Sequence, residues 1–315
     1  MSEPKHIRGV IAALLLPRDD ECRPAWQDFD RNAVFALRAG VSGLCVNGAT
    51  GEYAGATRQE RKEAVSRARR IAGPSGLILS GVGSTVWTRV LALARDAEEA
   101  GADALLVPAP HFFKYEPGDL AEFYRRIAAE VRVPALIYNL PAFAGGLDAG
   151  LAARLIREEK GIAGVKDSSG RLDLLERLAA SDGGDSVALV GNDTVLGEAL
   201  RRGLCDGVIS GVAGAVPEIT LALWRIAQES EWELFSRLES RLRSLVEKLE
   251  AFPTPWGLKI IAELRGLGSA SFALPLSAER QAQVDAFRLW FPQWWSEAES
   301  DLAESLHAES NLHPA

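Results

Sequence analysis

A lysine in the stretch GIAGVKDSSG, residues 161–170, is the residue whose surroundings most favour chemistry. Lys166 follows small and apolar residues and precedes two serines, whereas Lys62 and Lys160 lie among charged residues. Apolar surroundings disfavour the charged ammonium form, and the free amine is the nucleophile that forms a Schiff base with a carbonyl compound. The alternative is a lysine that reaches from a strand end to the surface and keeps its charge in water.

Short apolar runs rich in valine, isoleucine and leucine recur through the first two thirds of the chain. Runs without polar alternation are typical of strands buried on both faces of a parallel sheet. Eight such runs span residues 7–16, 42–48, 76–83, 103–109, 133–139, 161–167, 186–192 and 206–211. Segments with helical spacing separate them, and each gap is long enough for one crossover helix. This pattern predicts the α/β class and a (β/α)₈ TIM barrel. An open doubly wound sheet is the alternative, although no Gly-x-Gly-x-x-Gly follows the first run.

The pattern changes after residue 229. From residue 230 onward only helical periodicity is present, and it ends in an acidic, polar tail. We therefore expect two units: a catalytic barrel over residues 1–229 and a C-terminal helical domain over residues 230–315. The aromatic segment LWFPQWW is expected to pack this helical appendage onto the barrel, because such side chains bury large areas.

Composition excludes several classes of function. The 315 residues, 47% of them hydrophobic, suffice for one large core, and the net charge of −8 disfavours nucleic acids and anionic membranes as partners. No apolar run approaches the ~20 residues that span a bilayer, and the polar N-terminus has no signal-peptide core. We expect a soluble cytoplasmic protein. Cys22, Cys45 and Cys205 lack metal-ligand spacing, so we expect reduced thiols and no metal site.

In a (β/α)₈ barrel, the active site forms where the strands end and the following loops begin. The second run is followed by NGATGE, the fifth ends in YNLP, the sixth in KDSSG and the seventh in GND. Turn chemistry alone favours glycine, asparagine, aspartate and serine at such places, and Tyr138 is also explained as a core tyrosine. A strand-end lysine beside a strand-end tyrosine, however, favours a site that contains both Lys166 and Tyr138.

These motifs, taken in order, resemble those of the N-acetylneuraminate lyase/dihydrodipicolinate synthase family of pyruvate-dependent class I aldolases. The resemblance covers most of the chain. The segments that carry it are GLCVNGATGEYAGATRQER, LLVPAPHFFKYEP, VPALIYNLP, IAGVKDSSG, GVISGVAGAVPE, FPTPWGLKIIAELRG and ALPLS. The resemblance implies that Lys166 forms a Schiff base with pyruvate or another 2-oxo acid. It implies that Tyr138 is the acid and base that moves the proton of the substrate hydroxyl.

The resemblance also implies a binding site for the 2-oxo acid. Thr50 would hold the carboxylate with its hydroxyl and with nearby backbone N–H groups, so Ala49 and Gly51 belong to the candidate site. Ile209 would place a backbone carbonyl and an apolar wall beside the pyruvyl unit. No cofactor is implied beyond the covalent Schiff base on Lys166. The implied assembly is a homotetramer, built as a dimer of dimers.

Three residues or segments depart from the family pattern. Ala49 stands where the family often has a serine or threonine that relays protons. Phe112 stands where the synthase branch has a tyrosine received by a neighbouring subunit, and we keep it as a candidate substrate contact. YNLPAFAGG, residues 138–146, lacks the arginine that binds the second substrate's carboxylate in that branch. An unpaired carboxylate would lose about 2 kcal/mol or more.

Polar residues after the sixth and seventh strands are candidates for binding substrate hydroxyls. They are Ser168, and Asp193 together with Gly191 and Asn192. Helix capping is the alternative for each, because serine, asparagine and aspartate are preferred at helix N-termini.

The leading hypothesis is a class I aldolase that cleaves or forms a 2-oxo-3-deoxy acid with pyruvate as one product. A dehydratase of 2-keto-3-deoxy sugar acids would use the same imine and eliminate water instead. Dihydrodipicolinate synthase is the next alternative, weakened by the three departures. A barrel that binds a 2-oxo acid only to regulate a partner is the non-enzyme alternative.

Overall fold

Eight parallel strands form a closed barrel in the computed structural model, which describes residues 6–181, 186–229 and 231–312, with the backbone alone for 305–312. Each strand pairs with the next, and β8 returns to pair with β1. The strands are β1 (Gly9–Ala13), β2 (Gly43–Val46), β3 (Leu77–Gly81), β4 (Ala104–Pro108), β5 (Ala135–Asn139), β6 (Ile162–Asp167), β7 (Val187–Val190) and β8 (Gly207–Ser210). The predicted (β/α)₈ barrel is confirmed, and the open sheet is excluded.

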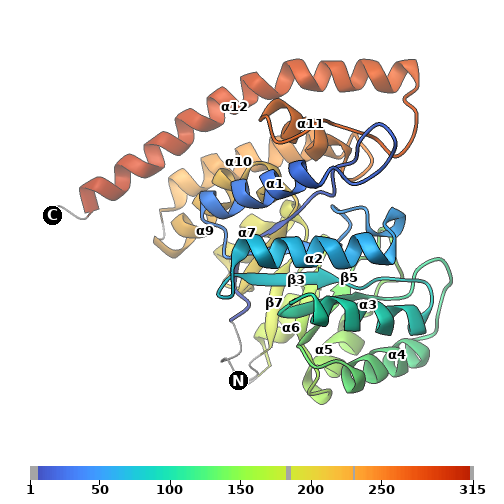
Figure 1. The fold of residues 1–315 in the computed structure, drawn as a ribbon. Coiled ribbons are helices and arrows are strands. Elements are labelled where there is room, and N and C mark those ends of the chain that lie inside the picture. Colours follow the sequence, from blue (N-terminus) through green and yellow to red (C-terminus); the bar gives the residue numbers. More distant parts are fainter. Residues whose placement is uncertain (1–5, 182–185, 230, 313–315) are drawn as a thin grey trace.

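Helices alternate with the strands and then continue beyond the barrel (Figure 1). Those of the barrel are α1 (Trp26–Ala39), η1 (Tyr53–Gly55), α2 (Arg58–Ala72), α3 (Trp87–Glu99), α4 (Pro117–Glu130), α5 (Ala149–Glu158), α6 (Asp173–Ala179), η2 (Asp193–Val195), α7 (Leu196–Arg201), α8 (Val212–Ala215) and α9 (Pro217–Glu229). The appendage consists of α10 (Trp232–Leu249), α11 (Trp256–Leu264) and α12 (Ala278–Leu312).

The apolar runs become strands because both of their faces are covered. Alternate side chains point into the barrel, where Ile11, Leu79, Leu106 and Leu189 form a compact cluster. The other set packs outward against the ring of helices in a second, larger cluster. A strand buried on both sides has no position at which a polar side chain is favourable, so polar residues collect where the strands end.

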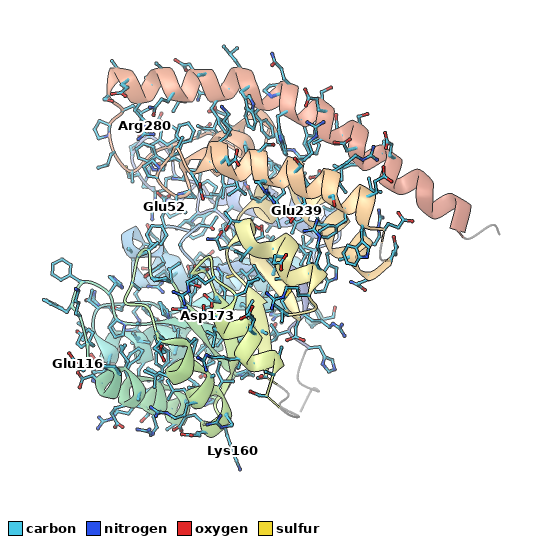
Figure 2. The ribbon with its side chains drawn as sticks, turned by 180° about the vertical axis from the view of Figure 1, so that it is seen from behind. Glu52, Glu116, Lys160, Asp173, Glu239 and Arg280 are labelled. Atoms are coloured by element: carbon cyan, nitrogen blue, oxygen red, sulfur yellow. The ribbon has the colours of Figure 1, made fainter. Side chains whose placement is uncertain are left out.

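The appendage packs along one side of the barrel, and its long last helix crosses α10 and α11 (Figure 1). Phe291 and Trp294, from the predicted aromatic segment, are buried, whereas Leu289 is exposed. Arg280, labelled in Figure 2, donates from Nη1 to the carbonyl oxygen of Ala251, just beyond α10, at 2.6 Å. The division at residue 229 stays a prediction. Among the described helices, none combines the length and apolarity that crossing a membrane requires.

Candidate active site

Strand register brings the two predicted catalytic side chains together. In the β5–β6 ladder, Tyr138 lies opposite Lys166. Lys166 Nζ donates to Tyr138 Oη at 3.2 Å and lies 4.3 Å from the centre of the tyrosine ring. Both residues are buried, with 4% of Lys166 and 2% of Tyr138 exposed. The alternative of a lysine that extends into water does not fit this burial.

Lys166 lines a cavity of about 330 Å³. The residues expected from the sequence that line it are Ala49, Thr50, Tyr138, Lys166, Ser168, Asp193 and Ile209. They come from the ends of five different strands, β2, β5, β6, β7 and β8. The cavity can hold a small 2-oxo acid with its carbonyl carbon beside an amine and a phenol, an arrangement that suits imine chemistry.

Thr50 closes one side of the cavity next to the end of β8. A Cβ atom added at Gly211, just after β8, would lie 3.2 Å from Thr50 Oγ1, so the threonine hydroxyl packs directly against that glycine. Ile209 lies in the cluster inside the barrel together with Tyr138. Thr50 and Ile209 therefore face the same small volume as the lysine.

Two candidate residues do not line this cavity. Gly51 donates its backbone N–H to the carbonyl oxygen of Gly48 at 3.1 Å, inside its own turn, and that hydrogen bond makes the N–H unavailable to a bound carboxylate. Phe112 is 85% exposed and packs edge-on against Phe113, with ring centroids 4.9 Å apart. Phe112 thus points away from the cavity of its own chain.

Of the two polar residues that follow Gly191, one caps a helix and the other lines the cavity. Asn192 caps η2, since its Oδ1 accepts from the backbone N–H of Thr194 at 3.0 Å. Asp193 lines the cavity, and its Oδ1 is buried without a hydrogen-bond partner among the described residues. Burial raises the pKa of Asp193, while a hydrogen bond from Ser210 and the charge of Lys166 act in the opposite direction. A substrate hydroxyl could donate to the unpaired oxygen.

Asp167, next to the lysine, has a structural role. Its Oδ1 accepts from the backbone N–H of Ser169 at 2.8 Å and from Asn139 Nδ2 at 3.1 Å. Burial raises the pKa of Asp167, and these hydrogen bonds partly offset the shift. Asp167 therefore joins the ends of β5 and β6 and keeps Tyr138 and Lys166 in register.

Gly191, the residue after β7, leaves room for the lysine side chain. A Cβ atom there would lie 2.2 Å from Ser168 Oγ and 2.9 Å from Lys166 Cε. We expect Gly191→Ala to displace the amine and to slow trapping of a pyruvate adduct by about 10- to 100-fold, because small misplacements of reacting groups are costly. Gly118→Ala is the matched control, since a Cβ at Gly118 meets no atom within 4 Å. Equal trapping rates in the two variants would contradict this account.

The helical appendage supplies much of the remaining cavity wall, which the sequence analysis did not anticipate. Eight of the lining residues come from the end of α10, the loop after it and the start of α11: Val246, Leu249, Glu250, Pro253, Thr254, Pro255, Gly257 and Leu258. The motif FPTPWGLK, already noted for its resemblance, covers several of them. Its position after the barrel strands gave no sign that it folds back over the strand ends.

A buried ion pair ties the loop that carries Thr50 to the appendage. Lys259 Nζ lies 2.5 Å from Glu52 Oε2 and donates to the carbonyl oxygen of Ser271 at 2.8 Å. Glu52 is labelled in Figure 2. Only 4% of Lys259 is exposed. Glu52 thus fixes its loop through a residue more than two hundred positions away in the sequence.

Removing this cation should loosen the loop that carries Thr50 and should also destabilise the fold. We expect Lys259→Met to lower the free energy of unfolding by about 3 kcal/mol, because it leaves Glu52 as an unpaired, largely buried charge. The KM for pyruvate should rise, since the Thr50 loop loses its anchor. Urea denaturation and steady-state kinetics measure the two effects. Lys62→Met, which breaks an exposed pair with Glu99, should cost less than about 1 kcal/mol. Equal losses in both variants would exclude an anchoring role.

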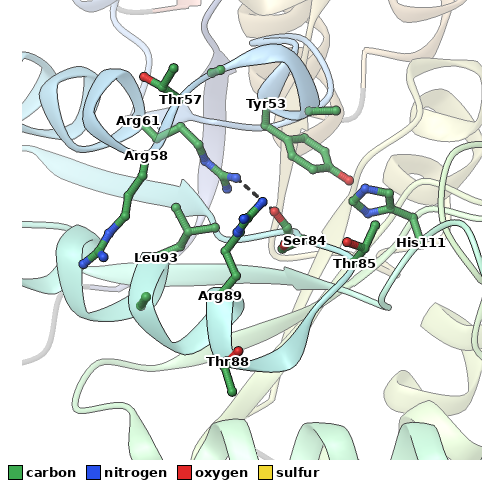
Figure 3. A pocket seen from close by; sticks show the side chains of 14 residues that line it. Tyr53, Thr57, Arg58, Arg61, Ser84, Thr85, Thr88, Arg89, Leu93 and His111 are labelled. Carbon is green, nitrogen blue, oxygen red and sulfur yellow. Dashed lines mark hydrogen bonds between the residues drawn. The ribbon is translucent and has the colours of Figure 1, made fainter.

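A second, larger cavity of about 670 Å³ lies beside η1, α2 and α3 and is lined by Arg58, Arg61, Arg89, Tyr53 and His111 among others (Figure 3). Arg61 donates to the carbonyl oxygens of Gly83 and Gly81, each at 2.9 Å, and so supports the end of β3. Burial and the charge of Arg61 lower the pKa of His111. None of the residues expected to perform catalysis lines this cavity.

Known proteins are similar to this chain over nearly its whole length. Residues 6–288 match the sequence model of the dihydrodipicolinate synthetase family. A 4-hydroxy-tetrahydrodipicolinate synthase of Methanopyrus kandleri is 30% identical over 284 residues, covering 90% of this chain and 94% of the relative. One from Bdellovibrio bacteriovorus is 29% identical over 287 residues, covering 90% and 97%. The solved structure of the 4-hydroxy-tetrahydrodipicolinate synthase from Methylacidiphilum fumariolicum SolV has a TM-score of 0.85 at 24% identity and covers 96% and 99%.

Proposed function

The chain belongs to the dihydrodipicolinate synthetase family of pyruvate-dependent, aldolase-type lyases, and from this premise we propose that Lys166 forms a Schiff base with pyruvate or another 2-oxo acid. The observation that carries the proposal is the buried contact between Lys166 Nζ and Tyr138 Oη at 3.2 Å. An amine and a phenol at one strand-end cavity provide a nucleophile and a group that can carry a proton. The intermediate is bound to the protein's own lysine, so the proposal requires no separate cofactor and no metal.

In the proposed cleavage, the amine of Lys166 attacks the 2-oxo carbon. Water leaves with the phenolic proton of Tyr138, which gives a protonated imine and a Tyr138 phenolate. Tyr138 takes the proton of the hydroxyl on C4. The C3–C4 bond then breaks and an aldehyde departs. The electron pair of that bond forms the C2–C3 double bond of an enamine. Protonation of C3 and hydrolysis of the imine then release pyruvate and the free lysine. Condensation follows the same steps in reverse.

We propose a 2-oxo-3-deoxy acid as the substrate, cleaved to pyruvate and an aldehyde or formed from them. Ser168 and Asp193 line the cavity next to the lysine and can accept or donate hydrogen bonds to substrate hydroxyls. Dehydration of such an acid would begin from the same imine. Two assays distinguish these reactions. A coupled dehydrogenase measures the release of pyruvate, and mass spectrometry measures the formation of a dehydrated 2-oxo acid.

The synthase is a second candidate because the relatives named above carry that name. Against it, no arginine is among the described residues that line the catalytic cavity, so a second substrate with a carboxylate lacks a counter-charge. Condensation of pyruvate with aspartate semialdehyde tests this candidate directly. Turnover with that substrate comparable to turnover with uncharged aldehydes would favour the synthase.

Trapping with borohydride tests the Schiff base itself. The wild-type protein is incubated with pyruvate and borohydride, its intact mass is measured, and the labelled peptide is mapped. We expect one reduced pyruvyl group per chain, located on Lys166. Lys259, equally buried but paired with Glu52, is the internal control and should remain unlabelled. An unlabelled protein, or labelling spread over surface lysines, would overturn the proposal.

We also propose the homotetramer that the family resemblance implies, arranged as a dimer of dimers. The exposed aromatic side chains Phe112, Phe113 and Tyr115 lie close together in the sequence, between β4 and α4, and support a contact surface between subunits. Light scattering coupled to gel filtration gives the mass in solution. A monomer under assay conditions would contradict this arrangement.

A further inference from the structure

We propose that Glu250 determines the charge of the substrates that the catalytic cavity accepts and excludes those with a carboxylate distant from the reacting carbonyl. The inference rests on the proposed Schiff base and deepens it, because it defines the aldehyde partner as an uncharged compound. Glu250 follows the last residue of α10 and lines the cavity that contains Lys166. A neighbouring cavity of about 250 Å³ shares Glu250, Asp193 and Val246 with it. Glu250 therefore stands between the two cavities.

Acidic side chains outnumber basic ones around Glu250. Among the described residues that line the catalytic cavity, Lys166 is the one cation, while Asp193 and Glu250 are the two acids. The neighbouring cavity adds Glu247 and one arginine, Arg243, together with Glu239, whose charge is already paired with Arg201 at 2.6 Å. Imine formation uses Lys166 at the 2-oxo carbon. Among the described residues, no further cation then remains in the catalytic cavity to receive a second carboxylate.

The cations close to the end of α10 have other neighbours and do not line the catalytic cavity. Arg243 pairs with Glu239 at 3.9 Å, and Lys248 Nζ lies 5.7 Å from the centre of the Trp290 ring. Arg280 donates to the carbonyl oxygen of Ala251. The C-terminus of the 18-residue helix α10 adds a partial negative charge of its own next to Glu250.

Helix α12 packs on the outer face of α10 and braces the helix that precedes Glu250. Arg241 pairs with Asp301 at 2.7 Å and with Glu297, and Trp294 Nε1 donates to Ser244 Oγ at 2.9 Å. Asp301, Glu297 and Trp294 lie beyond residue 288, where the match to the family model ends. The opposite face of the same helix end lines the cavity. The brace positions the backbone at the end of α10, and the exposed Glu250 side chain follows it directly and lines the cavity.

A pair of 2-oxo acids of equal chain length tests the inference without requiring carbon–carbon cleavage. 2-Oxovalerate ends in a methyl group and 2-oxoglutarate in a carboxylate, and both are trapped on the lysine by borohydride. We expect wild type to trap 2-oxovalerate about tenfold faster. At low salt, Glu250→Gln should lower the ratio of the 2-oxovalerate trapping rate to the 2-oxoglutarate trapping rate by about threefold or more. At high salt the mutation should have a smaller effect on this ratio, because ions screen separated charges. The rate for each acid is divided by the rate for pyruvate in the same variant, so that a general change in imine formation cancels.

Glu233→Gln is the matched control. It makes the same change in charge in the first turn of α10, 17 residues or about 26 Å along the helix from Glu250. Equal trapping of the two acids by wild type, or the same ratio in Glu250→Gln and Glu233→Gln, would overturn the charge selection while leaving the Schiff base intact. Failure of wild type to trap pyruvate would instead overturn the proposed function, and with it the inference that depends on it.

Discussion

Lys166→Ala protein will form no pyruvate adduct under borohydride, and its turnover will fall by at least about a thousandfold, because the covalent route is lost. Lys166→Arg should behave in the same way, since a guanidinium keeps its proton and does not act as a nucleophile. Intact-mass spectrometry after trapping and a pyruvate-release assay measure the two effects. Circular dichroism should be unchanged, because alanine fits inside a strand that other side chains already hold in place.

Lys160→Ala is the control, since Lys160 is an exposed lysine near the start of β6. It should keep both adduct formation and turnover. An adduct that still forms in Lys166→Ala would show that another lysine is the nucleophile. Turnover within tenfold of wild type in that variant would exclude covalent catalysis as the main route.

Tyr138→Phe should separate imine formation from bond cleavage. We expect turnover to fall by about 10²- to 10⁴-fold, the usual contribution of a positioned acid and base. The pyruvate adduct should still form, more slowly, because the lysine remains in place. Rapid-quench trapping and steady-state turnover measured on the same preparation give the two rates.

Tyr124→Phe is the matched control for Tyr138→Phe. Its hydroxyl donates to the carbonyl oxygen of Val107 at 3.1 Å, outside the catalytic cavity. Loss of that hydrogen bond should cost about 1 kcal/mol of stability and leave turnover within about twofold of wild type. Equal losses of turnover in the two variants would exclude proton transfer by Tyr138.

The sequence predicts the barrel and the central pair of the site for a physical reason. Continuous apolar runs indicate strands covered on both faces, and side chains at the ends of neighbouring parallel strands must meet at one rim. Lys166 and Tyr138 could therefore be placed together before their distance was known. Thr50 and Ile209 are predicted from the family resemblance, and both lie where strands end at the same rim.

The remaining parts of the site depend on tertiary contacts that no local pattern specifies. Helical periodicity in the appendage shows which face of α10 is apolar but not that its end, with Glu250, reaches the cavity. The pair between Glu52 and Lys259 joins positions far apart in the chain. Gly51 shows a different limit, because whether a backbone N–H is free depends on the turn around it.

Closure of the barrel has a consequence for how the protein is made. Gly9 in β1 pairs with Gly207 in β8, so the first strand acquires its second neighbour only after almost two hundred further residues have been synthesised. At about 5–20 residues per second, this takes roughly 10 to 40 s. Throughout that interval the nascent sheet has two open edges, which are the part of a sheet that joins other chains most readily. A chain that stops before β8 keeps both edges, and ribosome-bound chaperones are the natural protection for this stage of synthesis.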